Sequence, residues 1–149
     1  MNMITAEEAL IVRLATELDD AVDRKDWPRL RGFFAETVMV EVGVVAGESA
    51  KPLAADAFVA EIAAFNLPEK LACHSFTNPL VTIAGARAEF AANRYGWNLC
   101  ERFDPPLYEL WGRIAYAYVR HDRRWLIDRF RLEKLRDAGN PAVSMLRAD

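Results

Sequence analysis

Residues 107–121 read LYELWGRIAYAYVRH, and this stretch decides the fold of the chain. Every second residue from Tyr108 to Tyr118 is aromatic or aliphatic, apart from Gly112. Because successive side chains of a strand point to opposite faces, this alternation predicts one long strand, Leu107–His121, with a large apolar face. Strands usually span about five or six residues, so a strand of this length indicates a sheet that twists and curls.

Three further stretches around it have the same character. Pro79 lies inside the first of them, which implies an edge strand or a bulge. Short turns separate neighbouring stretches, so consecutive strands are expected to pair as an antiparallel meander. Besides Leu107–His121, the expected strands are Cys73–Ile83, Arg87–Phe103 and Trp125–Leu135, divided by Gly85-Ala86, Pro105-Pro106 and Asp122-Arg123.

Helix signals fill the first third of the chain. Thr5 and Glu8 have the spacing of a capping box. Apolar residues then recur every four positions from Leu10 to Val22, which predicts a helix that ends near residue 25. Asp26 is expected to cap a short second helix. The remaining expected elements are a strand over Thr37–Val42, a loop over Gly43–Ala54 and a third helix from about Asp56 to Phe65.

Helices that precede a run of strands indicate an α+β fold. The physical solution is three N-terminal helices packed in a strongly curved antiparallel sheet. Such a sheet leaves a pocket at its open mouth. We expect residues 1–149 to form a single domain. A chain of this length buries enough surface to need neither a disulfide nor a metal for stability.

The composition and net charge of the chain exclude several classes of protein. Hydrophobic residues make up 52% of the 149 residues and charged residues 28%, which excludes disorder and low complexity. No apolar run approaches a membrane span, and the N-terminus lacks the basic segment of a signal peptide, so a cytoplasmic protein is expected. The formal net charge of −3 argues against nucleic acid or an anionic membrane as a partner.

Motifs for cofactors and metals are absent from the sequence. No glycine-rich phosphate loop, nucleophile elbow or dinucleotide-binding fingerprint occurs, so no cofactor is expected. The two histidines and two cysteines do not have the spacing of a metal site. These residues are His74, His121, Cys73 and Cys100.

Four stretches give the chain a resemblance to a known family. Residues 18–27 end the first helix, residues 30–35 precede the first strand, His74 and Asn78 lie in the first long strand, and residues 122–127 form the last turn. In order and spacing they resemble the SnoaL-like group, and scytalone dehydratase in particular, within the nuclear transport factor 2-like (cystatin-like) superfamily. The resemblance covers about residues 5–141 and implies a cone-shaped α+β barrel. This superfamily hosts many functions, so the fold leaves the function open.

The resemblance also implies a catalytic pair. Asp23 matches the dehydratase's catalytic aspartate, and His74 matches one of its two pocket histidines. Dehydration of a β-hydroxy ketone removes a proton beside the carbonyl and protonates the departing hydroxide. A histidine oriented by a carboxylate can do both. The alternatives are a satisfied core histidine for His74 and an exposed acidic helix end for Asp23.

Several positions depart from the dehydratase pattern. Val22 and Val42 stand where the family has two tyrosines that hold a water against the substrate carbonyl, and Gly112 and Ile114 replace a serine and an asparagine. Asn98 is the best candidate for the place of the second histidine, and it can donate a hydrogen bond but not a proton. We therefore expect a more apolar pocket and a substrate other than scytalone. The expected substrate-binding residues are Val22, Val42, Tyr95, Asn98, Ile114, Tyr116 and Phe130.

These features favour a cofactor-independent dehydratase that acts on a small cyclic or aromatic carbonyl compound. One alternative is an isomerase or polyketide-type cyclase that uses the same pocket. The other is a non-catalytic domain that either binds a small molecule or serves assembly, and a pure assembly domain would have a plugged pocket. The expected ligand is a small, apolar, ring-containing molecule.

Two expectations concern the surface. An apolar stripe alternates with the pocket face of the longest strand, and a second subunit would cover it in a dimer or trimer. Asp128 either faces the pocket as a second acid or, as we favour, pairs with Arg113 or Arg131. The stripe consists of Trp111, Ala115, Ala117 and Val119, and the tryptophans Trp27, Trp111 and Trp125 are expected in the core or at the interface.

Overall fold

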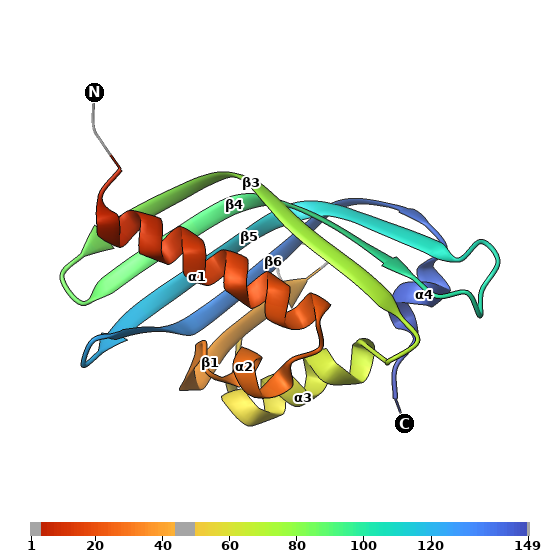
Figure 1. Cartoon of the computed structure of the whole chain (residues 1–149), viewed down its shortest axis with the longest axis horizontal. Helices are drawn as coiled ribbons and strands as arrows, with labels where there is room; N and C mark the ends of the chain where they lie inside the picture. The colour runs from red at the N-terminus through yellow and green to blue at the C-terminus, as the bar shows by residue number, and fades with distance from the viewer. Residues whose placement is uncertain (1–3, 44–49, 149) are drawn as a thin grey trace.

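The computed structural model describes residues 4–43 and 50–148. It has the expected α+β architecture, with N-terminal helices packed on one curved sheet of six strands that does not close (Figure 1). The elements are α1 (Ala6–Asp23), α2 (Trp27–Arg31), β1 (Phe34–Gly43), β2 (Lys51–Ala54), α3 (Ala55–Phe65), β3 (Leu71–Ala84), β4 (Arg87–Leu99), β5 (Leu107–His121), β6 (Arg124–Gly139) and α4 (Pro141–Met145).

The sheet has the strand order β2-β1-β6-β5-β4-β3. Strands β3 to β6 form the antiparallel meander that the sequence predicts, and β5 has the predicted bounds. The expectation of a wholly antiparallel sheet is wrong at one place, because β1 pairs with β6 in parallel. The chain between β1 and β6 contains β2, α3 and strands β3 to β5, and a long connection of this kind is what a parallel pair requires.

Several element ends differ from the sequence-based bounds; β1 begins at Phe34 instead of Thr37, and β3 at Leu71 instead of Cys73. Strand β4 stops at Leu99, because the next residue begins a turn in which the Cys100 N–H donates to the Pro106 carbonyl at 2.9 Å. Strand β6 continues beyond Leu135 to Gly139. Strand β2 lies inside the expected loop 43–54, of which residues 44–49 lie outside the described residues, and α4 was not expected.

Helix α1 lies across the concave face near β3 and β4 (Figure 1). Its first turn carries the predicted capping box, with the Glu8 N–H donating to the Thr5 hydroxyl at 3.1 Å. The face that it buries includes Ile11, Ala15 and Leu18. These side chains belong to one core with the inward residues of the sheet, among them Phe90 and Tyr116.

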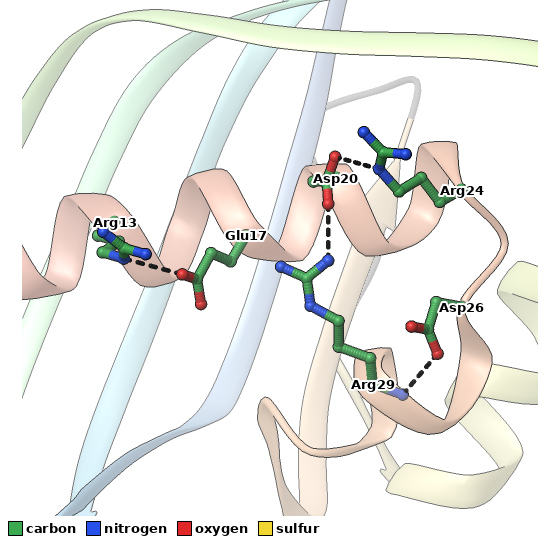
Figure 2. Close-up of polar contacts among 6 residues, drawn as sticks. All are labelled: Arg13, Glu17, Asp20, Arg24, Asp26 and Arg29. Carbon is green, nitrogen blue, oxygen red and sulfur yellow. Dashed lines mark hydrogen bonds and ion pairs between the residues drawn. The ribbon is translucent and has the colours of Figure 1, made fainter.

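Ion pairs line the outward face of α1 (Figure 2). Arg13 pairs with Glu17 at 2.8 Å, and the Asp20 carboxylate accepts hydrogen bonds from Arg24 at 2.7 Å and Arg29 at 2.6 Å. Arg29 lies on α2, so Asp20 ties the two helices together. Asp20 is therefore engaged on the helix surface, while Asp19 and Asp23 have partners in the sheet.

The described strand pairs contain four register shifts, and two of them bend the sheet at residues that the sequence singles out. One interrupts β3 between Thr77 and Leu80, so Pro79 occupies both an edge strand and a bulge. The other lies opposite Gly112, where a Cβ atom would stand 2.2 Å from the carbonyl oxygen of Glu133. Bulges increase local twist and re-aim side chains. Over the described residues, no helix has the length and apolar character that crossing a membrane requires.

Candidate active site

Asp23 and His74 meet where the end of α1 crosses β3. The His74 Nδ1 and the Asp23 Oδ1 lie 2.6 Å apart, and the His74 backbone N–H donates to Asp23 Oδ2 at 2.9 Å. Both side chains are largely buried, with 17% of His74 and 22% of Asp23 exposed. Because β3 is an edge strand, its outward N–H groups lack a strand partner, and Asp23 satisfies one of them. One carboxylate thus fixes both the ring and its backbone.

The contact with Asp23 determines the chemistry of the ring. An ionised carboxylate only accepts hydrogen bonds, so Nδ1 carries the proton and Nε2 keeps its lone pair in the neutral ring. This tautomer is assigned from the hydrogen bond. The ring lies against Gly96, its register partner on β4, where a Cβ atom would stand 2.8 Å from His74 Cδ2 and 3.4 Å from Nε2. A residue without a side chain is therefore required beside the ring.

A cavity of about 370 Å³ lies beside this pair. His74, Arg94, Gly96 and Asn98 form one wall, and Val42, Leu110, Leu132 and Met145 supply apolar surface. Because Arg94, Gly96 and Asn98 are alternate residues of β4, they share the inward face. The site thus has an acid–base group and polar side chains beside apolar walls.

Arg94 and Asp19 form a buried ion pair beneath the cavity. The Arg94 Nη1 donates to Asp19 Oδ1 at 2.5 Å, and only 10% and 6% of the two side chains are exposed. Burial disfavours the guanidinium charge, but Asp19, Tyr116 and Asp23 together outweigh this effect, and the pKa of Arg94 lies above its usual value. A cation is therefore held permanently at the inner end of the cavity wall.

A second polar group lies at the cavity rim. The Asp137 carboxylate accepts hydrogen bonds from Lys134 at 2.6 Å and from the Tyr108 hydroxyl at 2.9 Å. These hydrogen bonds lower the pKa of Asp137, and the carboxylate in turn raises the pKa of Lys134. The three side chains line the cavity as one mutually satisfied network.

The structure brings three of the sequence-predicted residues to the cavity, namely His74, Asn98 and Val42. Four others belong to the core instead: Val22, Ile114, Tyr116 and Phe130. Tyr116 stacks between Phe90 and Phe130. Burial raises the pKa of the Tyr116 and Tyr118 hydroxyls. These core residues do not line the cavity.

Tyr95 does not line the cavity, although the sequence analysis expects it to bind the substrate. It sits between Arg94 and Gly96, so its side chain faces the outer side of β4. There its hydroxyl donates to Glu109 at 2.6 Å and its ring packs on Trp111.

The expected partners of Asp128 are also wrong, because this carboxylate pairs with Arg87 at 2.5 Å. Arg113 and Arg131 pair with Glu133 and Glu41.

Sequence reasoning missed Arg94 and Gly96. The inward positions of β4 contain a signal for both, since apolar Ala88, Phe90 and Ala92 give way to Arg94, Gly96 and Asn98. Such a switch along one face of a strand marks the point where the core ends and a polar cavity begins. Among residues 4–43 and 50–148, no cluster of His, Cys, Asp and Glu is placed to hold a metal ion.

The described residues form other hollows, and two of them are similar to this cavity in volume. One, of about 390 Å³, lies on the outer face of the sheet around Leu80, Asn93 and Arg113, away from the histidine. The other, of about 400 Å³, is an open groove between α1 and β3 that Asp23 and His74 also line. Its remaining walls are polar apart from Phe76, whereas the cavity beside Arg94 combines His74 with several apolar side chains and is the candidate active site.

Solved structures with this fold match most of the chain. The Kfla4162 protein from Kribbella flavida has a TM-score of 0.79 at 20% identity, over 92% of this chain and 95% of its own. A candidate scytalone dehydratase from Novosphingobium aromaticivorans has a TM-score of 0.75 at 16% identity, over 89% and 86%. A type 2 hexachlorocyclohexane dehydrochlorinase has a TM-score of 0.70 at 14% identity, over 89% and 88%.

These identities establish the fold alone. No curated protein matches the chain in sequence. Residues 4–131, however, match the SnoaL-like domain family, and this stretch includes α1, all of β3 to β5 and both members of the Asp23–His74 pair. The chain therefore belongs to the SnoaL-like domain family.

Proposed function

We propose that the protein is a cofactor-independent dehydratase that acts on a small, ring-containing carbonyl compound. The observation that carries the proposal is the hydrogen bond of 2.6 Å between Asp23 and His74 at the wall of the 370 Å³ cavity. A general base must reach the proton that it removes and must be held in one tautomer. His74 meets the second condition through Asp23 and the first through its place in the cavity lining.

In the proposed reaction, His74 Nε2 removes a proton from the carbon beside the substrate carbonyl. The imidazolium that results is stabilised by the Asp23 carboxylate, which does not itself take the proton. The same nitrogen then returns the proton to the hydroxyl group that leaves from the next carbon, so that water departs. One histidine serves as base and then as acid, and no cofactor takes part.

The shape and lining of the cavity support a ring-containing substrate. Its volume is within the usual range of about 300–1,000 Å³ for small-molecule sites. Apolar side chains from β1, β5, β6 and α4 face Arg94 and Asn98 of the β4 wall, and Tyr108, Lys134 and Asp137 add a polar network at the rim, which suits a ring that carries oxygen atoms at its edge. The names of two structural neighbours, a candidate scytalone dehydratase and a dehydrochlorinase, both denote elimination reactions.

Isomerisation or ring closure through the same enolate is the alternative. It is favoured by the fact that, among the described residues, His74 is the one histidine in the cavity lining. A single base that moves a proton between two carbons needs no leaving group.

A panel of cyclic β-hydroxy ketones and unsaturated cyclic ketones tests these reactions. Wild-type protein should convert a β-hydroxy ketone to its conjugated enone, which appears as new ultraviolet absorption, and His74→Gln should lose about 10²–10⁴-fold of the rate. Double-bond migration in the unsaturated ketones, without enone formation from the hydroxy ketones, would favour the isomerase. Binding without any His74-dependent turnover would leave a non-catalytic binding domain.

A further inference from the structure

Arg94 is the most unusual group of the cavity. Its side chain is 10% exposed and forms one hydrogen bond among the described residues, from Nη1 to Asp19. Among the described residues, the buried side-chain polar atoms without a hydrogen-bond partner are Asp19 Oδ2 and the hydroxyls of Tyr116 and Tyr118. The remaining Arg94 nitrogens are not among them, and the Arg94 side chain lines the cavity. A guanidinium has five N–H donors, and most of these are uncommitted.

The other cavity cation differs from Arg94 in this respect. Lys134 lies 2.6 Å from Asp137, and that carboxylate also accepts the Tyr108 hydroxyl. The positive charge of Lys134 is therefore neutralised by Asp137, which lines the same cavity. Asp19, in contrast, contacts Arg94 from α1 and does not belong to the cavity lining. The positive end of the Asp19–Arg94 pair therefore faces the ligand space, while its negative end faces the helix.

The register of the sheet sets Arg94 relative to the base. His74 is paired with Gly96, and Arg94 lies two residues away on the same face of β4. Diagonal neighbours of this kind are separated by roughly 7–8 Å, and both side chains line one cavity. A ligand between them can present a carbon to His74 and an oxygen to Arg94 at the same time.

We propose that Arg94 is the oxyanion-binding residue of this site, which holds the substrate oxygen that becomes negatively charged. The inference rests on the proposed function. Arg94 would take over the contact with the substrate carbonyl that the family's two tyrosines make and that this chain lacks. When Nε2 of His74 takes the α-proton, the electrons of the C–H bond form a carbon–carbon double bond. The carbonyl π electrons move to oxygen, where Arg94 donates hydrogen bonds. Re-formation of the carbonyl then expels hydroxide, which leaves as water with the proton from His74.

This placement narrows the substrate to ring compounds with an acidic α-proton and a carbonyl or enol oxygen on one edge. Fixed donors aimed at a developing oxyanion act strongly in a site that excludes water. They bind the ionised form of an enol or phenol more tightly than its neutral form, because a nearby cation lowers the pKa of a bound acid.

The test uses 2-naphthol, a planar analogue of a ring enolate, and 2-methoxynaphthalene, which has the same ring and cannot ionise. Dissociation constants are measured for both, and the ionisation of bound 2-naphthol is followed by ultraviolet absorption across pH. In wild-type protein the pKa of bound 2-naphthol should fall by about 1 to 3 relative to the free compound.

Four variants locate the effect. Asp19→Asn combined with Arg94→Gln keeps a neutral hydrogen-bonded pair and avoids a buried unpaired charge. It should bind 2-methoxynaphthalene as wild type does and lose the change in the pKa of 2-naphthol. Lys134→Gln removes the other cavity cation, His74→Gln removes the base, and Asp19→Asn alone removes the partner of Arg94. All three should keep the change.

The outcomes separate this inference from the proposed function. An unchanged pKa for 2-naphthol bound to wild type, or an equal change in the double variant, would overturn the role of Arg94 and leave the role of His74 standing. Failure of wild type to bind either compound would overturn both. Loss of the change in the double variant, together with no His74-dependent turnover, would support Arg94 and overturn the dehydratase.

Discussion

At the residue scale, Asp23 holds His74 in two ways. One carboxylate oxygen contacts the ring nitrogen at 2.6 Å and the other accepts the His74 backbone N–H at 2.9 Å. An asparagine has only one accepting oxygen, and its NH2 group would face a donor at the other position. Asp23→Asn therefore breaks one contact and disturbs the ring, and the effects of Asp23 and His74 on activity should not be independent.

Gly96 offers the sharpest test of how the ring is positioned. Gly96→Ala would bring a Cβ to 2.8 Å from His74 Cδ2, so the ring must turn, since the backbone around it is fixed by the strand pair. We expect turnover to fall by up to about 100-fold with a stability loss of only about 0.5–1.5 kcal/mol, the cost of an off-rotamer side chain.

The measurement compares kcat with the urea midpoint of unfolding. Asn93→Ala, on the outer face of the same strand, serves as the control and should change neither. An alanine at position 96 that leaves kcat unchanged would show that the ring does not depend on the glycine for its orientation.

The sequence was sufficient for part of the site. Asp23 and His74 were identified through the order and spacing of the family's stretches, although their catalytic role stays a prediction. Arg94 could not be placed so easily, because its role depends on Asp19, which is 75 residues away in the chain. Tyr95 shows the same limit: its strand was predicted, but a shift of one residue decides which face a side chain occupies.

At the scale of elements, the bulge between β5 and β6 positions the cavity rim. The register shifts between Trp111 and Gly112, which leaves Leu135 as the extra residue between Lys134 and Arg136. A bulge of this kind turns the strand and aims the next side chains differently. Lys134 and Asp137 flank the bulged segment and face the cavity.

Gly112→Ala should destabilise this bulge. The new Cβ would stand 2.2 Å from the Glu133 carbonyl oxygen, a backbone atom that cannot move without the strand. We expect a loss of about 1–3 kcal/mol in the free energy of unfolding, as for overpacked sites, measured by urea denaturation.

Gly32→Ala is the matched control, since its backbone is helical and the nearest atom is 3.2 Å away. A Gly112→Ala variant as stable as this control would contradict the assignment of a close approach at the bulge.

Element prediction succeeded where the pattern is local. The alternation in β5 and the capping box of α1 depend on residues close in sequence, and both were confirmed. The parallel pairing of β1 with β6 was not predictable in this way, because it joins strands about 90 residues apart. Strand β2 has only four residues and includes Pro52, so its sequence carries little strand signal.

At the scale of the whole molecule, buried tyrosines should set the alkaline limit of stability. Burial raises the pKa of both Tyr116 and Tyr118, so the folded state keeps protons that the unfolded state loses above pH of about 10. The folded state then binds more protons, and stability falls by about 1.4 kcal/mol per buried tyrosine for each further pH unit.

Urea denaturation between pH 8 and 12 measures this slope, with phenolate absorption as a second probe. Burial lowers the pKa of Lys70, which has the opposite sign but acts only below the usual lysine value of about 10.4. The double variant Tyr116→Phe and Tyr118→Phe should lose most of the slope. Ionisation of all four tyrosines in protein that is still folded would contradict the burial of these two.

Oligomerisation is a further expectation at this scale. The outward face of β5 carries Trp111, Ala115, Ala117 and Val119, none of them fully exposed or fully buried. A second subunit on this face would remove apolar area from water. We expect light scattering at tens of micromolar to give a dimer or trimer, and Ala117→Glu to shift it toward the monomer. A wild-type monomer at this concentration would contradict the expectation.

The most direct test of the account is proton exchange at the α-carbon of a cyclic ketone, followed by NMR in deuterated water. The ketone 2-tetralone needs no leaving group, so the measurement isolates the first step assigned to His74. Wild-type protein should accelerate the exchange. His74→Gln and Asp23→Asn should each lose about 10²–10⁴-fold, and the double variant should be little worse than either, because the two residues act as a unit. Exchange that persists in His74→Gln at the wild-type rate, or losses that multiply in the double variant, would contradict the Asp23–His74 mechanism.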